Sequence, residues 1–177
     1  SSSDEAEALV GQAVEEFAAK IKAGQTPDSY VFFLGRENFP QTYGPKTYKL
    51  GEAQVLREGS RCVIAAAGAM VGQALKAAEQ VDATVINLSS INHPDVKTVA
   101  KALEKCGGKL LTVEDHQLAG GMGAVLIQAL MQADVSFKAK SLGVKGEFGQ
   151  SAYNAIELYR KHGLDSESIA RAAKQLG

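Results

Sequence analysis

The sequence predicts an α/β protein with a mainly parallel sheet that helices cover on both sides. From Tyr48 onward, patterns typical of strands alternate with patterns typical of helices, and such alternation indicates a parallel sheet. Two expected strands, residues 52–57 and 61–66, flank the turn signal Glu58-Gly59-Ser60 and predict a β-hairpin. The hairpin adds one antiparallel edge strand. A chain of 177 residues has room for one such domain and a short appendage.

The appendage is an expected helix followed by one strand. Apolar residues recur at three- and four-residue spacing over residues 9–21, which predicts a helix that begins near Asp4 and ends before Gly24. The continuous apolar run Tyr30–Leu34 predicts a strand buried on both faces. Glycine and proline turn signals then break the pattern. We therefore expect residues 1–45 to be the remnant of one domain and residues 46–177 to form another.

The rest of the chain continues the alternation. It predicts helices at about 69–80, 95–105, 121–132, 152–161 and 165–175, and strands at 83–88, 109–113 and 137–143. A buried amino-terminal strand that lacks its neighbours would leave an exposed edge. We therefore expect either self-association or an amino-terminal segment that packs against the main domain.

Charge and cysteine content exclude several classes of protein. The 19 basic and 20 acidic residues nearly cancel and are scattered, so nothing indicates a nucleic-acid or membrane partner. No apolar stretch approaches the roughly 20 residues that cross a bilayer. Cys62 and Cys106 lie far apart, without a histidine at ligand spacing. This favours a reduced, cytoplasmic protein without a disulfide or a metal site, with Cys62 as a core residue.

A glycine-rich segment is the first candidate binding site. Gly120, Gly121 and Gly123 follow an expected strand and open an expected helix, where free backbone N–H groups often bind phosphate. The segment is not a dinucleotide fingerprint, because Leu126 stands where the third glycine would be. Two interpretations stay open: an anion site, or glycines that let the helix start close to the sheet.

Two further groups of polar residues lie at strand ends. Glu114-Asp115-His116 could support proton transfer, but consecutive strand residues point in different directions, so helix capping and interface hydrogen bonds are the alternative. Arg36 directly follows the expected strand at 30–34. A guanidinium there could bind a phosphate or carboxylate with two hydrogen bonds, although Glu37 also offers a structural salt bridge.

Several segments, taken together, resemble the transketolase family. Phe33-Leu34-Gly35-Arg36-Glu37-Asn38-Phe39-Pro40 resembles the "LSRQNLP" stretch that closes the family's pyrimidine-binding domain. Leu111-Thr112-Val113-Glu114-Asp115-His116 with Gly120-Gly121-Met122-Gly123 resembles "VEDH…GGxG". Weaker similarities cover Leu50–Gly59, Ile91–Asp95 ("IKPLD") and Leu142–Tyr159. The matches follow the family's order over about residues 30–175.

The resemblance implies a three-layer α/β/α carboxyl-terminal domain, with a five-stranded sheet and one antiparallel edge strand. In the family, a homodimer transfers a two-carbon ketol unit between sugar phosphates with thiamine diphosphate and a divalent metal. The family arginine that contacts the substrate phosphate corresponds to Arg36; Gly35 and Glu37 depart from the family's Ser and Gln. The "GDG…N" motif that binds diphosphate and metal does not occur in this sequence.

The resemblance therefore implies a carboxyl-terminal transketolase fragment that works with the rest of its polypeptide. It would contribute dimer contacts and Arg36, would carry no catalytic residue or metal site, and alone would hold no cofactor and have no activity. Two alternatives stay open. One is a free-standing anion-binding or regulatory module. The other is the same part of another thiamine diphosphate enzyme, either deoxyxylulose-phosphate synthase or a 2-oxoacid dehydrogenase β subunit.

Overall fold

A computed structural model describes residues 2–26, 29, 31 and 51–176. The chain divides into two compact units, residues 1–41 and 42–177, and each is treated by itself below. The strand predicted at 30–34 falls, apart from Val31, outside the described residues. The domain boundary predicted at residues 45–46 lies outside them as well and stays a prediction.

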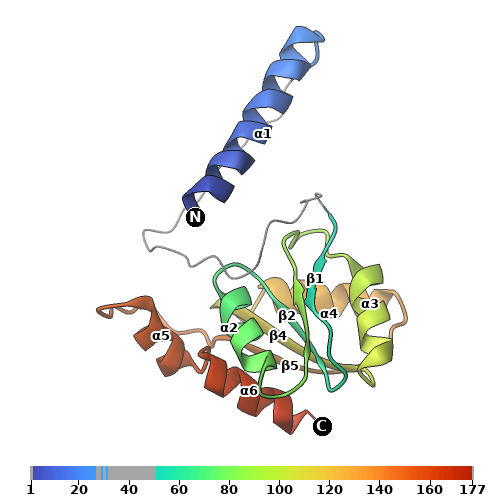
Figure 1. The fold of residues 1–177 in the computed structure, drawn as a ribbon, viewed down its shortest axis with the longest axis vertical. Helices are drawn as coiled ribbons and strands as arrows, with labels where there is room; N and C mark the ends of the chain where they lie inside the picture. Colours follow the sequence, from blue (N-terminus) through green and yellow to red (C-terminus); the bar gives the residue numbers. More distant parts are fainter. Residues whose placement is uncertain (1, 27–28, 30, 32–50, 177) are drawn as a thin grey trace. The chain divides into compact units, whose positions relative to one another are not determined.

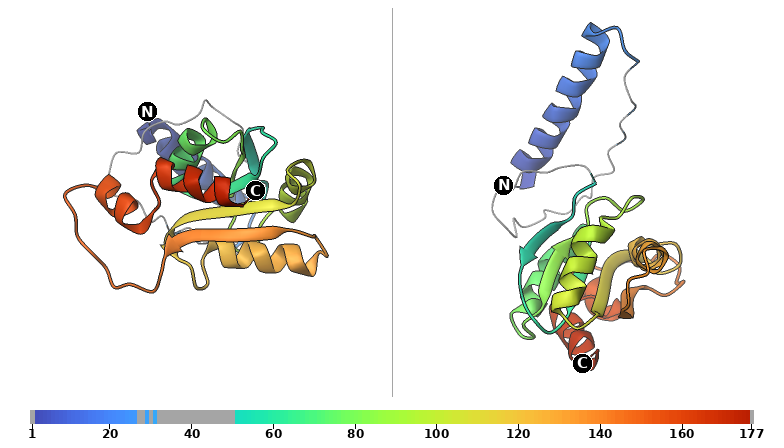
Figure 2. Two further views of the ribbon diagram at one scale, coloured as in Figure 1. Left: turned by 90° about the horizontal axis from the view of Figure 1, so that it is seen from below. Right: turned by 90° about the vertical axis from the view of Figure 1, so that its right-hand side faces the viewer.

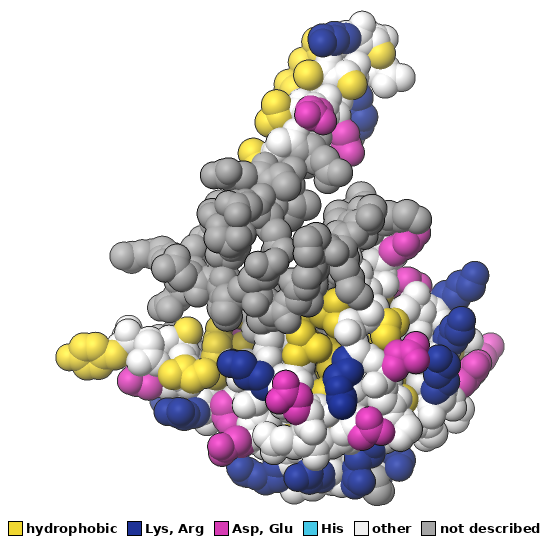
Figure 3. Space-filling model, viewed as in Figure 1, with side chains coloured by type: hydrophobic (Ala, Val, Ile, Leu, Met, Phe, Trp, Pro, Cys, Tyr) yellow, Lys and Arg dark blue, Asp and Glu magenta, His cyan; other side chains and the backbone are white. Residues whose placement is uncertain are grey.

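The first unit contains the predicted amino-terminal helix, α1 (Ser2–Lys22). Its chain turns off at Gly24, whose φ of +69° favours glycine. Val10, Val14, Phe17 and Ile21 recur at helical spacing and are 38–60% exposed. They form an apolar stripe along one side of the helix (Figure 3). This α1 stripe has the spacing of a helix face that other proteins bury in a core.

The second unit is built on a five-stranded sheet with the order β1-β3-β2-β4-β5 (Figure 1). The strands are β1 (Gln54–Arg57), β2 (Val63–Ala66), β3 (Thr84–Asn87), β4 (Lys109–Gln117) and β5 (Lys138–Val144). Only β1 runs antiparallel to its neighbour; the other three pairings are parallel. The predicted mostly parallel sheet with one antiparallel edge strand is confirmed.

Helices cover both faces of this sheet (Figure 2). One face carries α2 (Met70–Ala78) and α6 (Ser166–Gln175), and the other carries α3 (Val96–Lys105) and α4 (Met122–Gln132). The short helix α5 (Ala155–His162) precedes α6. All five helices agree with the predicted ranges to within three residues at each end. The three-layer α/β/α architecture is therefore confirmed.

The predicted β-hairpin is wrong. β1 pairs with β3, and β2 lies between β3 and β4. The reason is burial: all four residues of β2 are buried, whereas β1 is only partly buried throughout. A strand that is apolar on both faces gains most from a central position between two parallel partners. The connection at residues 58–62 therefore carries the chain past β3 instead of making a two-strand turn.

The core lies on both faces of the central strands. Ile64, Val85 and Leu111 face α2 and α6, while Ala65, Ile86 and Leu110 face α3 and α4. Alternate residues of each strand thus enter opposite layers, as the pleat of a strand requires. Cys62 is fully buried in the first layer and is a free thiol, as predicted.

Burial gives Cys62 a measurable pH signature. Burial and the neighbouring Cys106 raise the pKa of the Cys62 thiol from 9.0 to about 11, against the opposing influence of Arg61 and Lys109. Between pH 9 and pH 11 the Cys62 thiol keeps its proton in the folded state but has lost it in the unfolded state. The stabilising contribution is therefore complete below pH 9 and disappears as the pH rises toward 11.

We expect Cys62 to contribute about 1.4 kcal/mol less to the free energy of unfolding at about pH 10 than at about pH 7. The reason is that about pH 10 lies one pH unit above the pKa of 9.0 that the thiol has in the unfolded chain, and each unit changes the free energy by about 1.4 kcal/mol. Urea unfolding of wild type and Cys62→Ala at both pH values isolates this difference from the titration of lysines and tyrosines. A gap between the two proteins that does not narrow at high pH contradicts the shift.

Candidate functional site

Glu114 connects the sheet to a helix near the carboxyl ends of the strands. It lies on β4, is only 3% exposed, and stands beside the start of α4. Its two carboxylate oxygens accept hydrogen bonds from the backbone N–H of Met122 at 2.6 Å and of Gly123 at 2.9 Å. The amino end of a helix carries unpaired N–H groups and a partial positive charge, so an internal carboxylate stabilises it. Helix capping, one of the two alternatives for Glu114-Asp115-His116, is confirmed for Glu114.

Two glycines of the candidate anion site, Gly121 and Gly123, pack closely against this carboxylate. A Cβ atom on Gly121 would overlap the Glu114 carboxylate and the Gln117 carbonyl oxygen, and one on Gly123 would overlap the Thr112 hydroxyl. Gly120 has a φ of +74°, which favours glycine. Close packing therefore accounts for Gly121 and Gly123, and backbone conformation accounts for Gly120. Anion binding here stays a prediction, and an external anion would have to displace Glu114.

Asp115 and His116 do not join Glu114 in one catalytic group. Both are exposed, whereas Glu114 is buried. His116 Nδ1 lies 3.3 Å from the Gln117 carbonyl oxygen. Asp115 is near the end of β2, where its Oδ1 would lie 3.9 Å from a Cβ atom on Gly68. This agrees with the expectation that consecutive strand residues point in different directions.

Arg36, the predicted substrate-phosphate ligand, lies outside the described residues. The structure therefore does not test whether Arg36 lies near the carboxyl ends of the strands, and its role stays a prediction.

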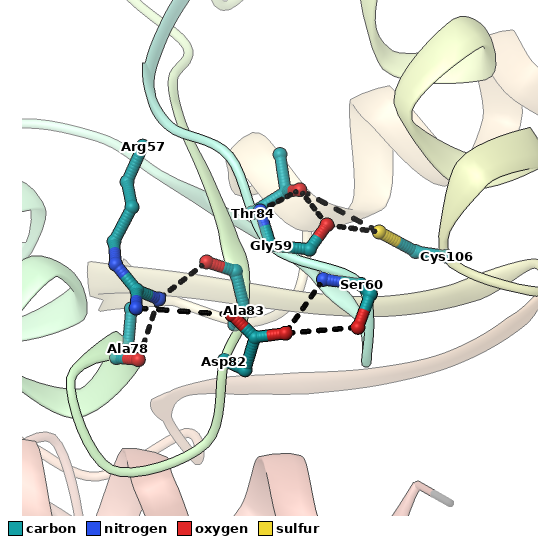
Figure 4. A network of polar contacts seen from close by, with 8 residues as sticks. All are labelled: Arg57, Gly59, Ser60, Ala78, Asp82, Ala83, Thr84 and Cys106. Carbon is teal, nitrogen blue, oxygen red and sulfur yellow. Dashed lines mark hydrogen bonds and ion pairs between the residues drawn. The ribbon is translucent and has the colours of Figure 1, made fainter.

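A polar network that the sequence did not indicate lies at the amino ends of the strands, where β2 and β3 begin (Figure 4). Arg57 donates to the carbonyl oxygens of Ala78 at 2.6 Å and Ala83 at 3.0 Å, and its guanidinium lies 3.8 Å from Asp82. The Ser60 hydroxyl donates to Asp82 at 2.8 Å. These contacts tie the end of β1 to the turn between α2 and β3.

Thr84 completes the network from the first residue of β3. Its hydroxyl donates to the Gly59 carbonyl oxygen at 2.8 Å and accepts from the Gly59 N–H at 3.0 Å. The Cys106 thiol donates to the same carbonyl at 3.4 Å. A Cβ atom on Gly59 would overlap the backbone of Asp82. Ligands of open α/β sheets usually bind at the carboxyl ends of the strands, whereas this network lies at their amino ends. We therefore assign it a structural role, which is to stabilise the 58–62 connection.

Among the described residues, the potential metal ligands do not gather into a metal site. No group of three His, Cys, Asp or Glu side chains among them could hold a metal ion. Over the same part of the chain, every buried side-chain nitrogen and oxygen has a hydrogen-bond partner. No described helix is both long and apolar enough to cross a membrane.

The fold and these contacts define a class: a three-layer α/β/α domain in which a buried glutamate of the sheet caps the following helix. Residues 51–169 match the family model described as "Transketolase, C-terminal domain". The chain belongs to the transketolase C-terminal domain family, as the resemblance implied.

Curated relatives agree with this assignment. The chain is 33% identical over 135 residues to a 1-deoxy-D-xylulose-5-phosphate synthase of Heliobacterium modesticaldum, a match that covers 73% of this chain and 21% of the relative. It is 31% identical over 154 residues to one subunit of an apulose-4-phosphate transketolase of Phocaeicola vulgatus, with 83% and 48% covered. The chain thus spans about a fifth to a half of the length of these relatives.

A solved structure shares the fold. It is described as a split-gene transketolase, an inactive β4 tetramer, and superposes with a TM-score of 0.72 at 26% sequence identity. The match covers 80% of this chain and 48% of that one.

Proposed function

We propose that this chain is the carboxyl-terminal part of a transketolase. The complete enzyme would transfer a two-carbon ketol unit between sugar phosphates, with thiamine diphosphate and a divalent metal held by other parts of the protein. This chain would supply contacts of a homodimer and the phosphate-binding Arg36, and it would be inactive by itself. The proposal includes a role in the pentose phosphate pathway and a cytoplasmic location.

One observation carries the proposal. The family model matches 51–169, and the matched relatives are about two to five times as long as their matched parts. The α1 stripe supports it further, because an apolar helix face of 38–60% exposed side chains is expected where the rest of a domain covers it. An enzyme divided between two polypeptides is consistent with the name of one relative, which describes it as a transketolase subunit.

A second candidate is 1-deoxy-D-xylulose-5-phosphate synthase. It is favoured by identities of 33% and 38% to synthases of Heliobacterium modesticaldum and Thermomicrobium roseum. The two candidates share the cofactor and the carboxyl-terminal fold but form different products.

The native protein from its source distinguishes these candidates. We expect mass spectrometry of the purified native complex to find these residues in, or bound to, polypeptide well beyond 18.6 kDa. The complex should transfer ketol units between sugar phosphates when thiamine diphosphate is added. Formation of 1-deoxyxylulose 5-phosphate instead supports the second candidate. A native 18.6 kDa chain without either activity contradicts both.

The proposed role of Arg36 in binding the substrate phosphate can be tested in the same complex. Because a hydrogen-bonded charge pair contributes about 1.5–3 kcal/mol, Arg36→Ala should raise the KM for a phosphorylated substrate by roughly 10-fold or more, with a much smaller change in kcat. Arg160→Ala, at an exposed position of α5, is the matched control and should leave KM unchanged. Equal effects of the two variants would remove Arg36 from the substrate site.

A further inference from the structure

A groove opens at the carboxyl ends of β4 and β5, beside α5. It encloses a cavity of about 300 Å³. Val144 at the end of β5, Leu158 on α5 and Leu164 just after α5 give it an apolar lining, and Leu164 is buried. These side chains come from separate parts of the chain. The tertiary fold alone assembles the groove.

The charged side chains of the groove are of one sign. Asp115 and Glu147 line it, and none of the described residues that line it is a lysine or arginine. Neither carboxylate makes an ion pair with any cation in the described part of the chain. The His162 imidazole also lines the groove. An apolar pocket with two carboxylates at its margin favours a ligand that combines an apolar body with a positive charge.

The chain holds one wall of the groove in place. The Gln117 side chain at the end of β4 donates to the Glu147 carbonyl oxygen at 3.1 Å and accepts from the Gly146 N–H at 2.9 Å. Gln150 donates to the Glu147 carboxylate at 2.7 Å. The connection from β5 to α5 is therefore fastened to β4 before any ligand arrives, which lowers the entropic cost of binding.

The apolar surface continues beyond the cavity. Phe148, on the same connection, is 96% exposed, and Tyr153 at its far end is 100% exposed. Phe148 also lines the cavity, whereas a ligand small enough to fit it would leave the Tyr153 ring in water. Exposed aromatic residues beside a pocket are typical of surfaces that bind another polypeptide, where aromatic side chains contribute most of the affinity.

We propose that this groove, formed by the ends of β4 and β5, the connecting segment and α5, binds a polypeptide segment with an arginine or lysine beside an apolar side chain. The apolar side chain fills the cavity over Val144 and Leu164, and the cation pairs with Asp115 and Glu147. The backbone of the segment passes along Phe148. This interaction is independent of which thiamine enzyme the chain belongs to.

The test uses the full 177-residue chain and a defined probe. The peptide acetyl-Leu-Arg-Phe-amide is titrated into the ¹⁵N-labelled protein, and backbone amide shifts are followed by NMR. We expect saturable shifts concentrated in 115–117, 144–150 and 158–164. The matched peptide acetyl-Leu-Glu-Phe-amide should bind about 10-fold more weakly or not at all, since its charge repels the two carboxylates.

Two double variants locate the charge contribution. Asp115→Asn with Glu147→Gln should weaken binding of the arginine peptide about 10-fold, because two exposed pairs of up to about 0.7 kcal/mol each are lost. Glu79→Gln with Glu104→Gln removes the same charge from exposed positions elsewhere and should leave binding unchanged. Circular dichroism checks that both variants stay folded.

Three outcomes would overturn the proposal. The first is the absence of saturable shifts in these segments, and the second is equal binding of the arginine and glutamate peptides. The third is binding of phenethylamine as tightly as the peptide with the same shifts, which would mean a small-amine site and no polypeptide partner.

Discussion

Glu114→Ala is expected to lower the free energy of unfolding of residues 51–176 by about 3 kcal/mol, since it removes two charge-assisted hydrogen bonds and leaves two buried N–H groups unpaired. Those groups belong to Met122 and Gly123, in the first turn of α4. No other side chain in the described part of the chain caps this helix. Urea unfolding followed by far-ultraviolet circular dichroism measures the loss directly.

Glu114→Gln tests the cause of that loss. The amide keeps the size of the side chain but has one acceptor oxygen, so its NH₂ group faces a backbone N–H. We therefore expect an intermediate loss of about 2 kcal/mol. Asp115→Asn, at the adjacent exposed position, is the control and should change stability by less than about 0.5 kcal/mol. A Glu114→Ala variant as stable as this control would show that the carboxylate does not hold α4.

Gly121→Ala should destabilise the same domain by about 3 kcal/mol, because the added methyl group overlaps two atoms that cannot easily move. One is the Gln117 carbonyl oxygen, which is backbone, and the other belongs to the Glu114 carboxylate. Gly121 has a φ of −77° and a ψ of −176°, which any residue adopts. The expected effect is therefore steric and does not include a conformational penalty. Thermal or urea unfolding measures it.

Gly149→Ala is the matched control. A Cβ atom there meets nothing within 4 Å, so stability should change by less than about 0.5 kcal/mol. The double variant Glu114→Ala with Gly121→Ala adds a second check. Once the Glu114 carboxylate is gone, part of the overlap with the added methyl group disappears. The loss of unfolding free energy in the double variant should therefore be about 1 kcal/mol smaller than the sum of the losses in the two single variants. Strict additivity would mean that the two residues do not share one packed unit.

The same variants separate the two interpretations of the glycine-rich segment. If the segment binds an external anion, Gly121→Ala should lose phosphate binding while remaining stable. If it serves only to pack α4 against β4, stability should fall and phosphate should not bind to the wild type. The bonds from Met122 and Gly123 to Glu114 favour the second result.

The sequence by itself determined the class of the fold and most of its elements. Helical periodicity and apolar strand runs depend on neighbouring residues, so local patterns were enough to place α2, α3 and α6 within two residues at either end. The resemblance to transketolases also followed from sequence alone, since short motifs kept the family's order along the chain. For the glycines before α4, the sequence left two interpretations open, an anion site or a close approach between helix and sheet.

Only the tertiary structure decided which strands are neighbours and which polar groups meet. β1 joins β3 instead of β2 because the burial of β2 on both faces, a property of the whole sheet, outweighs the short turn between them. Glu114 reaches the N–H groups eight and nine residues later because β4 and α4 pack side by side. The groove near Leu164 joins segments up to 49 residues apart, from Asp115 to Leu164. Such contacts depend on the assembled sheet and its helices, and no local pattern encodes them.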